Sequence, residues 1–506
     1  MERAGHQVLQ LCENWAPAQR VLRAHFPEVP LADDVRTIEV DQPYDLLAAG
    51  FPCVDLSHAG RQQGIFGPQS GLVEEVFRIA AATRPRYVLI ENVTNLLRLG
   101  RGTGIAHVID SLTALGYSWA YRVLDSRATG VPQRRRRVFL LASLTPNPER
   151  ILFAETGTTH PQANATDASG FYWTEGRRGV GLVRGAVPTL KGGSTLGLPS
   201  APAIWDPGAE VGRRIVVPTI GHAEALQGFP DGWTSPAAAE GEPDRRWKLV
   251  GNAVTVGIGE WLGQRLAASA ADTVGADGPL LRSQPWPDAA FGGPDGEYRA
   301  AVTDRPGNVP MTALSSVIAD GAARPLSRRA SAGFLSRVDE SGIKLDPAFR
   351  RDLTEHRDHM AQEESWASTP AVRARMQRVA KVGTVPERRI RKALTARGAR
   401  YRLQVKLLQG ERFTSDIVFA GAKVVVDVRG CYWHACPEHS SAPKENADRW
   451  ALKFEQNRAR DQRMVDALTA AGWHVETVWE HDDIEAVADH IVATVAARAP
   501  QKRVSA

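Results

Sequence analysis

Cysteine is scarce in this sequence, since its 506 residues include only four: Cys12, Cys53, Cys431 and Cys436. The opening residues, Met-Glu-Arg-Ala-Gly-His, lack the apolar stretch of an export signal. We therefore expect a cytoplasmic protein with reduced thiols rather than a secreted protein stabilised by disulfides. Long apolar runs are lacking too, because no uncharged run approaches the roughly 20 residues that cross a bilayer. The sequence predicts no insertion into a membrane.

A large excess of either charge is also missing. The net charge is +5 and the pI is near 9.1, which permits a polyanionic partner without demonstrating one. With 43% apolar and 24% charged residues, the composition is that of ordinary globular domains. Because domains commonly have roughly 100–200 residues, this length predicts about two to four of them.

Residues 1–145 alternate short apolar runs with helical patterns. The expected strands are Tyr44–Ala49, Tyr87–Ile90 and Val138–Ala142, and the expected helices are Ala16–His25, Leu72–Ala82 and Gly104–Leu115. This alternation predicts a parallel sheet with helices on its faces, in which sites form at the carboxyl ends of the strands.

The rest of the chain divides by composition. Residues 146–212 are rich in Gly, Pro and Thr and indicate an irregular insertion or a small domain, and a further globular piece follows at 213–270. Over 271–363, Pro, Gly, Ala and Ser with scattered charge indicate a partly disordered linker, with a helix near Pro347–Gln362. A last compact unit is expected over 364–497.

Three polar segments follow or precede the expected strands of the first region. Gly50-Phe51-Pro52-Cys53 follows the first strand, and Glu91-Asn92-Val93 ends the second. Gln133-Arg134-Arg135-Arg136-Arg137 leads into the third. Taken singly, a cysteine is more often a buried structural residue, and an arginine run is more often a solvated face or a phosphate contact.

Together and in this order, the three segments resemble the catalytic motifs of DNA (cytosine-5-)-methyltransferases. The resemblance continues with Arg214–Pro230, which contains Leu-Gln-Gly-Phe-Pro, and with Gly251–Val254. It covers about 1–270 and implies an α/β, Rossmann-like, S-adenosylmethionine-dependent fold. Residues 146–212 take the place of its small target-recognition domain. It also implies a double-stranded DNA substrate whose target base is flipped out of the helix.

The resemblance assigns a role to individual residues. Cys53 would be the nucleophile that adds to cytosine C6, and Glu91, Arg135 and Arg137 would stabilise the charges that this addition creates. The remaining assignments are Glu13, Asp34 and Asn252 for the cofactor and Gln133 for DNA. The family's Gly-rich first motif would lie ahead of Met1, so we expect either an earlier start or an incomplete cofactor pocket.

A second group of polar residues lies within 364–497. Cys431, Cys436, His439 and His481 offer the ligands of a tetrahedral Zn²⁺ site, although their spacing is not that of a standard finger and also fits scattered surface residues. Asp416 lies on an expected strand, Phe413–Phe419, whose hairpin partner is Lys423–Arg429. Such an acid is suited to hold a hard cation such as Mg²⁺.

This segment resembles very-short-patch repair endonucleases, which nick DNA beside a thymine mispaired with guanine. The resemblance implies a restriction-endonuclease-like α/β fold of the PD-(D/E)xK type, in which Asp416 binds Mg²⁺ and His434 activates water. Glu387, Asn457 and Asp461 also match the family. Tyr432, Trp433 and Trp450 match aromatic residues that enter the base stack. Where the family commonly has Asp or His, this chain has Arg429, so we expect Asp427 to be a second metal ligand and Arg429 to stabilise charge.

Three functions are compatible with this combination. Deamination of 5-methylcytosine gives thymine, so a methyltransferase fused to a T·G nicking enzyme would repair the damage that methylation invites. Alternatively, the nuclease would cut foreign DNA in a restriction-modification system, or a non-catalytic first half would deliver the nuclease to DNA. The sequence favours repair, and cutting of matched DNA would distinguish restriction from it.

Overall fold

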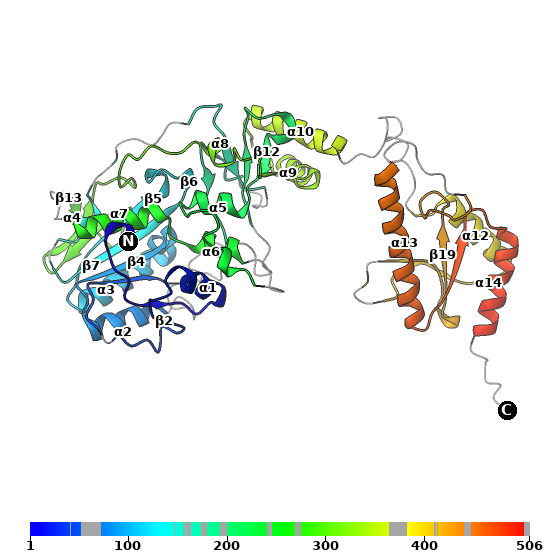
Figure 1. Ribbon diagram of the computed structural model, residues 1–506, viewed down its shortest axis with the longest axis horizontal. Helices are drawn as coiled ribbons and strands as arrows, with labels where there is room; N and C mark the ends of the chain where they lie inside the picture. The colour runs from blue at the N-terminus through cyan, green and yellow to red at the C-terminus, as the bar shows by residue number, and fades with distance from the viewer. Residues whose placement is uncertain are drawn as a thin grey trace. The chain divides into compact units, whose positions relative to one another are not determined.

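The chain folds into two compact units, Met1–Ala361 and Gln362–Ala506 (Figure 1). The computed structural model describes residues 1–40, 42–51, 72–145, 147–154, 157, 163–173, 180–192, 200–239, 245–268, 275–363, 382–408, 411, 413–439 and 447–499. Within these ranges, no helix combines the length and apolar character needed to span a bilayer.

A seven-stranded sheet forms the centre of the first unit, in the order β13-β15-β14-β5-β7-β4-β3. Only β3 and β4 are parallel, whereas β4–β7, β5–β7 and β14–β5 are antiparallel, so the predicted parallel sheet is a mixed one. The strands are β3 (Leu46–Gly50), β4 (Tyr87–Val93), β5 (Ser118–Asp125), β7 (Arg136–Ser143), β13 (Ala276–Pro279), β14 (Ala289–Gly293) and β15 (Gly296–Ala300).

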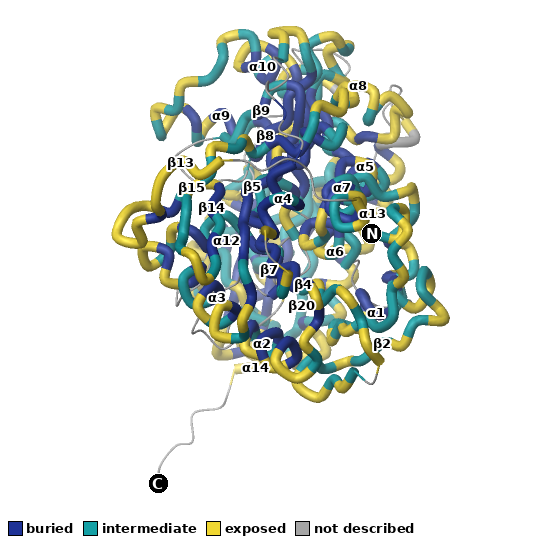
Figure 2. The backbone as a smooth tube through the Cα atoms, turned by 90° about the vertical axis from the view of Figure 1, so that its left-hand side faces the viewer, coloured by how far each residue is buried: buried dark blue, intermediate teal, exposed yellow. Residues whose placement is uncertain are grey.

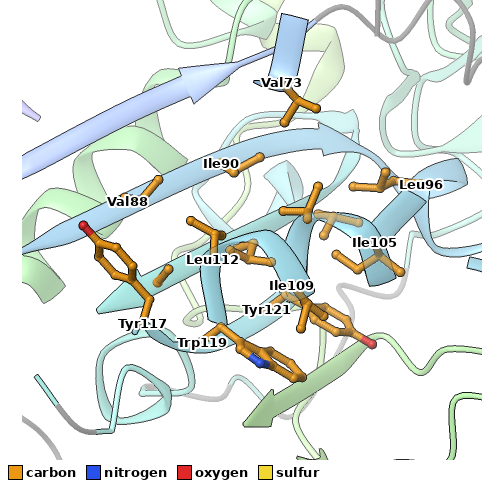
Figure 3. Packing of buried hydrophobic residues seen from close by; sticks show 14 of the residues in the cluster. Val73, Val88, Ile90, Leu96, Ile105, Ile109, Leu112, Tyr117, Trp119 and Tyr121 are labelled. Atoms are coloured by element: carbon orange, nitrogen blue, oxygen red, sulfur yellow. The ribbon is translucent and has the colours of Figure 1, made fainter. Parts of the chain in front are cut away.

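Helices cover both faces of this sheet. On one face, α2 and α3 pack against alternate residues of β4 such as Val88 and Ile90 (Figure 3). On the other, α4 and α7 pack against the residues between them, such as Leu89. Because both faces are buried, β4, β5 and β7 are mostly apolar on both faces, and they form part of the dark core of Figure 2. The helices are α1 (Ala16–His25), α2 (Val73–Thr83), α3 (Thr103–Ala114), α4 (Glu149–Leu152) and α7 (Val256–Ala267).

A second, antiparallel sheet of five strands lies in the same unit, in the order β16-β12-β11-β8-β9. Its strands are β8 (Ser169–Phe171), β9 (Val183–Arg184), β11 (Ala203–Trp205), β12 (Ile215–Val217) and β16 (Arg324–Pro325). A short parallel pair, β6 (Gln133–Arg134) with β10 (Val187–Pro188), joins this part to the segment that precedes β7. The helices around the five-stranded sheet are α5 (Ile220–Leu226), α6 (Arg246–Asn252), α8 (Leu314–Val317), α9 (Arg328–Ser341) and α10 (Pro347–Glu363).

The predicted linker over 271–363 is wrong. Three strands of that region extend the central sheet, and β16 closes one edge of the second sheet. Phe334 and Phe349 of α9 and α10 are buried against Phe171 and Trp205. The predicted helix near Pro347–Gln362 is confirmed as α10. The sheet of the small domain therefore contains strands from 146–217 and from 324–325. Its apolar residues are covered by α9 and α10.

The second unit is a four-stranded sheet in the order β17-β18-β19-β20, with helices on both faces. Ile417 and Val426 face α12 and α14, whereas Val418 and Val425 face α13. The elements are α12 (Val385–Ala396), β17 (Arg402–Val405), β18 (Ser415–Phe419), β19 (Val424–Arg429), α13 (Ala447–Ala470), β20 (His474–Trp479) and α14 (Ile484–Arg498). The predicted hairpin is confirmed as β18–β19.

Candidate functional site

Cys53 lies outside the described residues, but the chain up to Phe51, two residues before it, is described. Gly50, at the end of β3, pairs with Glu91 on β4. The Asn92 side chain is buried, and its Nδ2 donates to the carbonyl oxygen of Phe51 at 3.3 Å. Gly50 and Phe51, which lead toward Cys53, therefore lie beside Glu91 and Asn92. Asn92 is part of the Glu91-Asn92-Val93 segment, but its hydrogen bond to Phe51 could not be predicted from the sequence.

Glu91 and Arg137 form an ion pair between neighbouring strands. Arg137 Nε lies 3.2 Å from Glu91 Oε1, and both side chains are largely buried. Burial raises the pKa of Glu91, while Arg137 and Arg135 act in the opposite direction. A carboxyl group in this setting is suited to give a proton or a hydrogen bond.

Arg135 and Gln133 are buried and hold other parts of the unit together. Arg135 donates to the carbonyl oxygens of Gly251 and Ala253, at 3.1 and 2.8 Å. It thus fixes the predicted last motif, and its predicted role in stabilising charge stays a prediction. Gln133 is fully buried, and its amide contacts Gln227 and the backbone of Leu190. The prediction that Gln133 contacts DNA is therefore wrong, because its amide is enclosed within the fold.

The predicted cofactor residues lie at two places. The parallel strands β1 (Leu11–Cys12) and β2 (Leu31–Ala32) end together, so Glu13 and Asp34 follow the same edge of this small sheet. Asp34 pairs with Arg36 through Oδ2 at 2.7 Å, which holds the pKa of its carboxyl low. Asn252 is exposed at the end of α6. Carboxylates that follow parallel strands fit the binding of ribose hydroxyls and an adenine amino group.

In the second unit, three acids gather where β18 and β19 meet α12. Asp416 Oδ2 accepts from the backbone nitrogen of Val428 at 3.0 Å. Burial, together with the nearby charges of Asp427 and Glu387, raises the pKa of Asp416 to about 6. Asp427 is buried and lies 2.7 Å from Arg429 Nε. The geometry therefore brings the two predicted Mg²⁺ ligands together, although Asp427 already has a cationic partner.

His434 is oriented by an acid on α13. Its Nδ1 lies 2.6 Å from Asp461 Oδ2. Although burial acts in the opposite direction, hydrogen bonds from His434 and Arg460 hold the pKa of Asp461 below its usual range. Asn457 donates to the carbonyl oxygen of Trp433 and so fixes the neighbouring loop. An acid bound to Nδ1 leaves Nε2 to interact with water.

The aromatic residues of the second unit form one cluster with different exposures. Tyr432 is 37% exposed, and its ring centre is 5.4 Å from that of Trp450. Trp433 is partly buried, whereas Trp450 is only 5% exposed and packs on Phe454. The prediction that Trp450 contacts DNA is wrong, because this ring supports the cluster from inside. Tyr432 and Trp433 remain the predicted DNA contacts.

The four predicted Zn²⁺ ligands are brought together, with all their ligand atoms within 4.8 Å of one another. Cys431 Sγ lies 3.2 Å from His481 Nδ1, and Cys436 Sγ lies 3.8 Å from His439 Nδ1. A tetrahedron with bonds of about 2.0 Å to nitrogen and 2.3 Å to sulfur separates its ligands by roughly 3.3–3.8 Å. The donor types therefore suit zinc, and the two Cys–His distances lie near this range, although the four atoms together spread over up to 4.8 Å, which is wider than a closed tetrahedron.

Comparisons with known proteins agree with both resemblances. Residues 1–173 match the model of C-5 cytosine-specific DNA methylases, and residues 367–439 match that of the DNA mismatch endonuclease Vsr. Type II methyltransferase M2.BsuMI of Bacillus subtilis (strain 168) is 39% identical over 377 residues, which cover 72% of this chain and 96% of that protein.

Two nicking enzymes are similar to the second unit. Type II nicking enzyme V.XorIIP of Xanthomonas oryzae pv. oryzae is 45% identical over 107 residues, which cover 21% of this chain and 76% of that enzyme. Type II nicking enzyme V.NaeI of Lentzea aerocolonigenes is 39% identical over 122 residues, with coverages of 24% and 74%. The chain therefore belongs to the C-5 cytosine-specific DNA methylase family and carries a Vsr-type mismatch endonuclease domain as its second unit.

Proposed function

We propose that the first unit methylates cytosine at C5 through a covalent bond between the Cys53 sulfur and C6. The observation that supports this is the Glu91–Arg137 pair beside Gly50 and Phe51, which precede Cys53 in the chain. Cytosine C5 is too weak a nucleophile to attack a methyl donor directly. Addition of a thiolate at C6 makes C5 enamine-like and therefore reactive.

Glu91 and Arg137 would stabilise the negative charge that this addition places on the cytosine ring. Attack at C6 moves electron density toward N3 and O2 of the ring. Glu91, with its raised pKa, donates a proton or a hydrogen bond at N3, and the Arg137 guanidinium stabilises O2. Once C5 has gained the methyl group, a base would remove the C5 proton, and the electrons of that C–H bond would expel the Cys53 thiolate from C6. S-adenosylmethionine supplies the methyl group, and Glu13, Asp34 and Asn252 are the residues proposed to hold it.

The second unit is proposed to nick double-stranded DNA beside a T·G mismatch. Asp416 and Asp427 would hold Mg²⁺, whose charge stabilises the departing phosphate oxygens, and His434 would orient the attacking water. Tyr432 and Trp433 would enter the base stack at the mismatch. The Cys431, Cys436, His439 and His481 cluster would bind a structural Zn²⁺. Arg429 would balance charge on Asp427 when the cation is absent.

The first experiment measures transfer of a tritiated methyl group to mixed-sequence DNA. The parent chain is compared with Cys53→Ser and with Glu91→Gln. We expect no transfer with Cys53→Ser and a loss of about 10²–10⁴-fold with Glu91→Gln, the range of general acid catalysis. Full activity of Cys53→Ser would refute the covalent route.

The second experiment tests the nuclease on duplexes that differ only in one T·G mismatch. We expect Mg²⁺-dependent nicking of the mismatched duplex and its loss in Asp416→Asn. Equal cutting of the matched, unmethylated duplex would refute repair and favour restriction.

A further inference from the structure

Gln404 of β17 has a backbone conformation that side chains rarely adopt. Its φ is +52°, in the left-handed region that glycine tolerates and a glutamine does not favour. The residue is neither at a helix end nor in a tight turn, the two places where such angles are usually found. Strained residues of this kind cluster at functional sites, where the surrounding structure maintains them.

The position of Gln404 in the sheet relates it to the proposed metal site. β17 and β18 pair so that Leu403 lies opposite Ile417 and Val405 lies opposite Ser415. Gln404 is therefore the residue opposite Asp416. Its Nε2 donates to Asp416 Oδ1 at 3.1 Å. The strained residue thus contacts the acid on which the proposed nuclease depends.

Asp416 is consequently held at both of its oxygens. Gln404 contacts Oδ1, and the backbone nitrogen of Val428 donates to Oδ2 at 3.0 Å. Each carboxylate oxygen can accept more than one interaction, so both retain capacity for a cation. Two contacts from different strands fix the plane of the carboxylate and thus the direction in which a cation would be bound.

We propose that Gln404 is a positioning residue of the metal site, whose carboxamide fixes the Asp416 carboxylate in the orientation that binds the divalent cation. This inference rests on the proposed role of Asp416 in binding Mg²⁺. A neutral amide suits this task, because a Lys or Arg would compete with the cation and an acid would add a further negative charge beside Asp427 and Glu387.

The test measures Mn²⁺ binding by calorimetry on the zinc-loaded full chain. Gln404→Leu removes the amide and keeps a bulky side chain, whereas Gln404→Gly removes the amide and relieves the backbone. Lys423→Gly is the matched control, since Lys423 has a φ of +50° in the turn between β18 and β19 and is exposed. We expect both Gln404 variants to bind Mn²⁺ on the order of 10-fold more weakly and Lys423→Gly to bind like the parent.

A second readout separates positioning from a general structural role. The rate of nicking is measured against Mg²⁺ concentration for the same three variants. We expect the Gln404 variants to need about 10-fold more Mg²⁺ and to recover most of the parent rate at saturation. Parent-like Mn²⁺ affinity in both Gln404 variants would overturn the inference, as would a loss of rate that Mg²⁺ does not restore.

Asp416→Asn distinguishes failure of the inference from failure of the proposed function. If Asp416→Asn abolishes Mn²⁺ binding while both Gln404 variants bind like the parent, only the role of Gln404 is wrong. If Asp416→Asn binds Mn²⁺ like the parent, the metal site itself is elsewhere, and both proposals fall.

Discussion

Phe349→Ala tests whether the region after residue 270 is part of the first unit. Phe349 is fully buried in α10, and its ring centre is 4.8 Å from that of Phe171 and 5.0 Å from that of Trp205. Replacing a buried Phe by Ala costs about 3–5 kcal/mol, from lost burial and from the cavity that remains. A flexible linker would show a change of less than about 0.5 kcal/mol at the same position.

The expected shift in melting temperature follows from the size of the unit. Unfolding entropy is about 2.1 cal/mol/K per residue, which is about 0.8 kcal/mol per degree for the 361 residues of Met1–Ala361. Phe349→Ala should therefore lower the Tm of this unit by about 4–7 °C in differential scanning calorimetry. If the smaller sheet melts by itself, its shift should be larger.

The control is Leu281→Ala, at a side chain that is 49% exposed in the same region of the sequence. It should move the same transition by less than about 1 °C, because a change of less than about 0.5 kcal/mol is divided by the same entropy. Equal and negligible shifts in the two variants would show that α10 does not pack on the small sheet, and the corrected domain boundary would then be wrong.

Four further outcomes concern the two sites. Burial beside Asp427 and Glu387 raises the pKa of Asp416 to about 6. Only the ionised form binds a cation, so the Mn²⁺ affinity should fall about tenfold per pH unit below that pH, and a constant affinity in calorimetry would contradict this. Tyr432→Ala should weaken binding to mismatched DNA, measured by fluorescence anisotropy, with little change in the free energy of unfolding. Trp450→Ala should lower the free energy of unfolding of the second unit by about 3–5 kcal/mol. The reverse pattern would exclude the roles assigned to the two residues. A zinc chelator should lower the Tm of the second unit alone, and an unchanged transition would remove zinc from the Cys/His cluster. Gln133→Ala should destabilise the first unit by about 1–3 kcal/mol in urea denaturation, because it leaves buried partners unsatisfied. Weaker DNA binding by Gln133→Ala at an unchanged free energy of unfolding would instead restore Gln133 as a DNA contact.

Local pattern was enough to predict several elements and residues. Ala16–His25 is the helix expected, because its apolar residues recur at helical spacing and Pro17 lies in its first turn, where proline is tolerated. The Cys/His cluster was also visible, since its ligand types are rare in this chain. The hairpin that carries Asp416 and Asp427 was predicted correctly, because two apolar strands joined by a short turn pair antiparallel, while the role of the two acids as metal ligands stays a prediction.

What the sequence did not predict depends on contacts between distant segments. The region 271–363 has the composition of a linker, but Trp286 and Ala290 are buried once β14 pairs with β5. The direction of that pairing cannot be read from periodicity, so the mixed sheet was missed as well. Gln133 and Trp450 match motif positions that contact DNA, but segments distant in the sequence pack over both side chains and bury them. A motif alone does not show this burial. The strain at Gln404 is a backbone property without a sequence signal.

Glu91 and Asp416 are both buried carboxyl groups, but they are proposed to do different chemistry. The charges next to each carboxyl group account for the difference. Burial raises the pKa of Glu91 and of Asp416 alike. Glu91 has Arg137 and Arg135 near it, so the protein itself supplies the balancing charge, and the carboxyl can exchange a proton at a ring nitrogen.

Asp416 has acids for neighbours instead. When all groups are ionised, the net charge of this cluster is about −2, from the three acids Glu387, Asp416 and Asp427 and the one cation Arg429. A divalent cation would balance that charge. Asp427→Asn should therefore lower the pKa of Asp416 in the metal-free protein, because a repelling charge is removed. The same change should weaken Mn²⁺ binding, because a ligand is lost. Titration of Asp416 by NMR and calorimetry with Mn²⁺ would measure the two effects separately. A weaker affinity without a change in the pKa would mean that Asp427 binds the cation but lies too far from Asp416 to repel it.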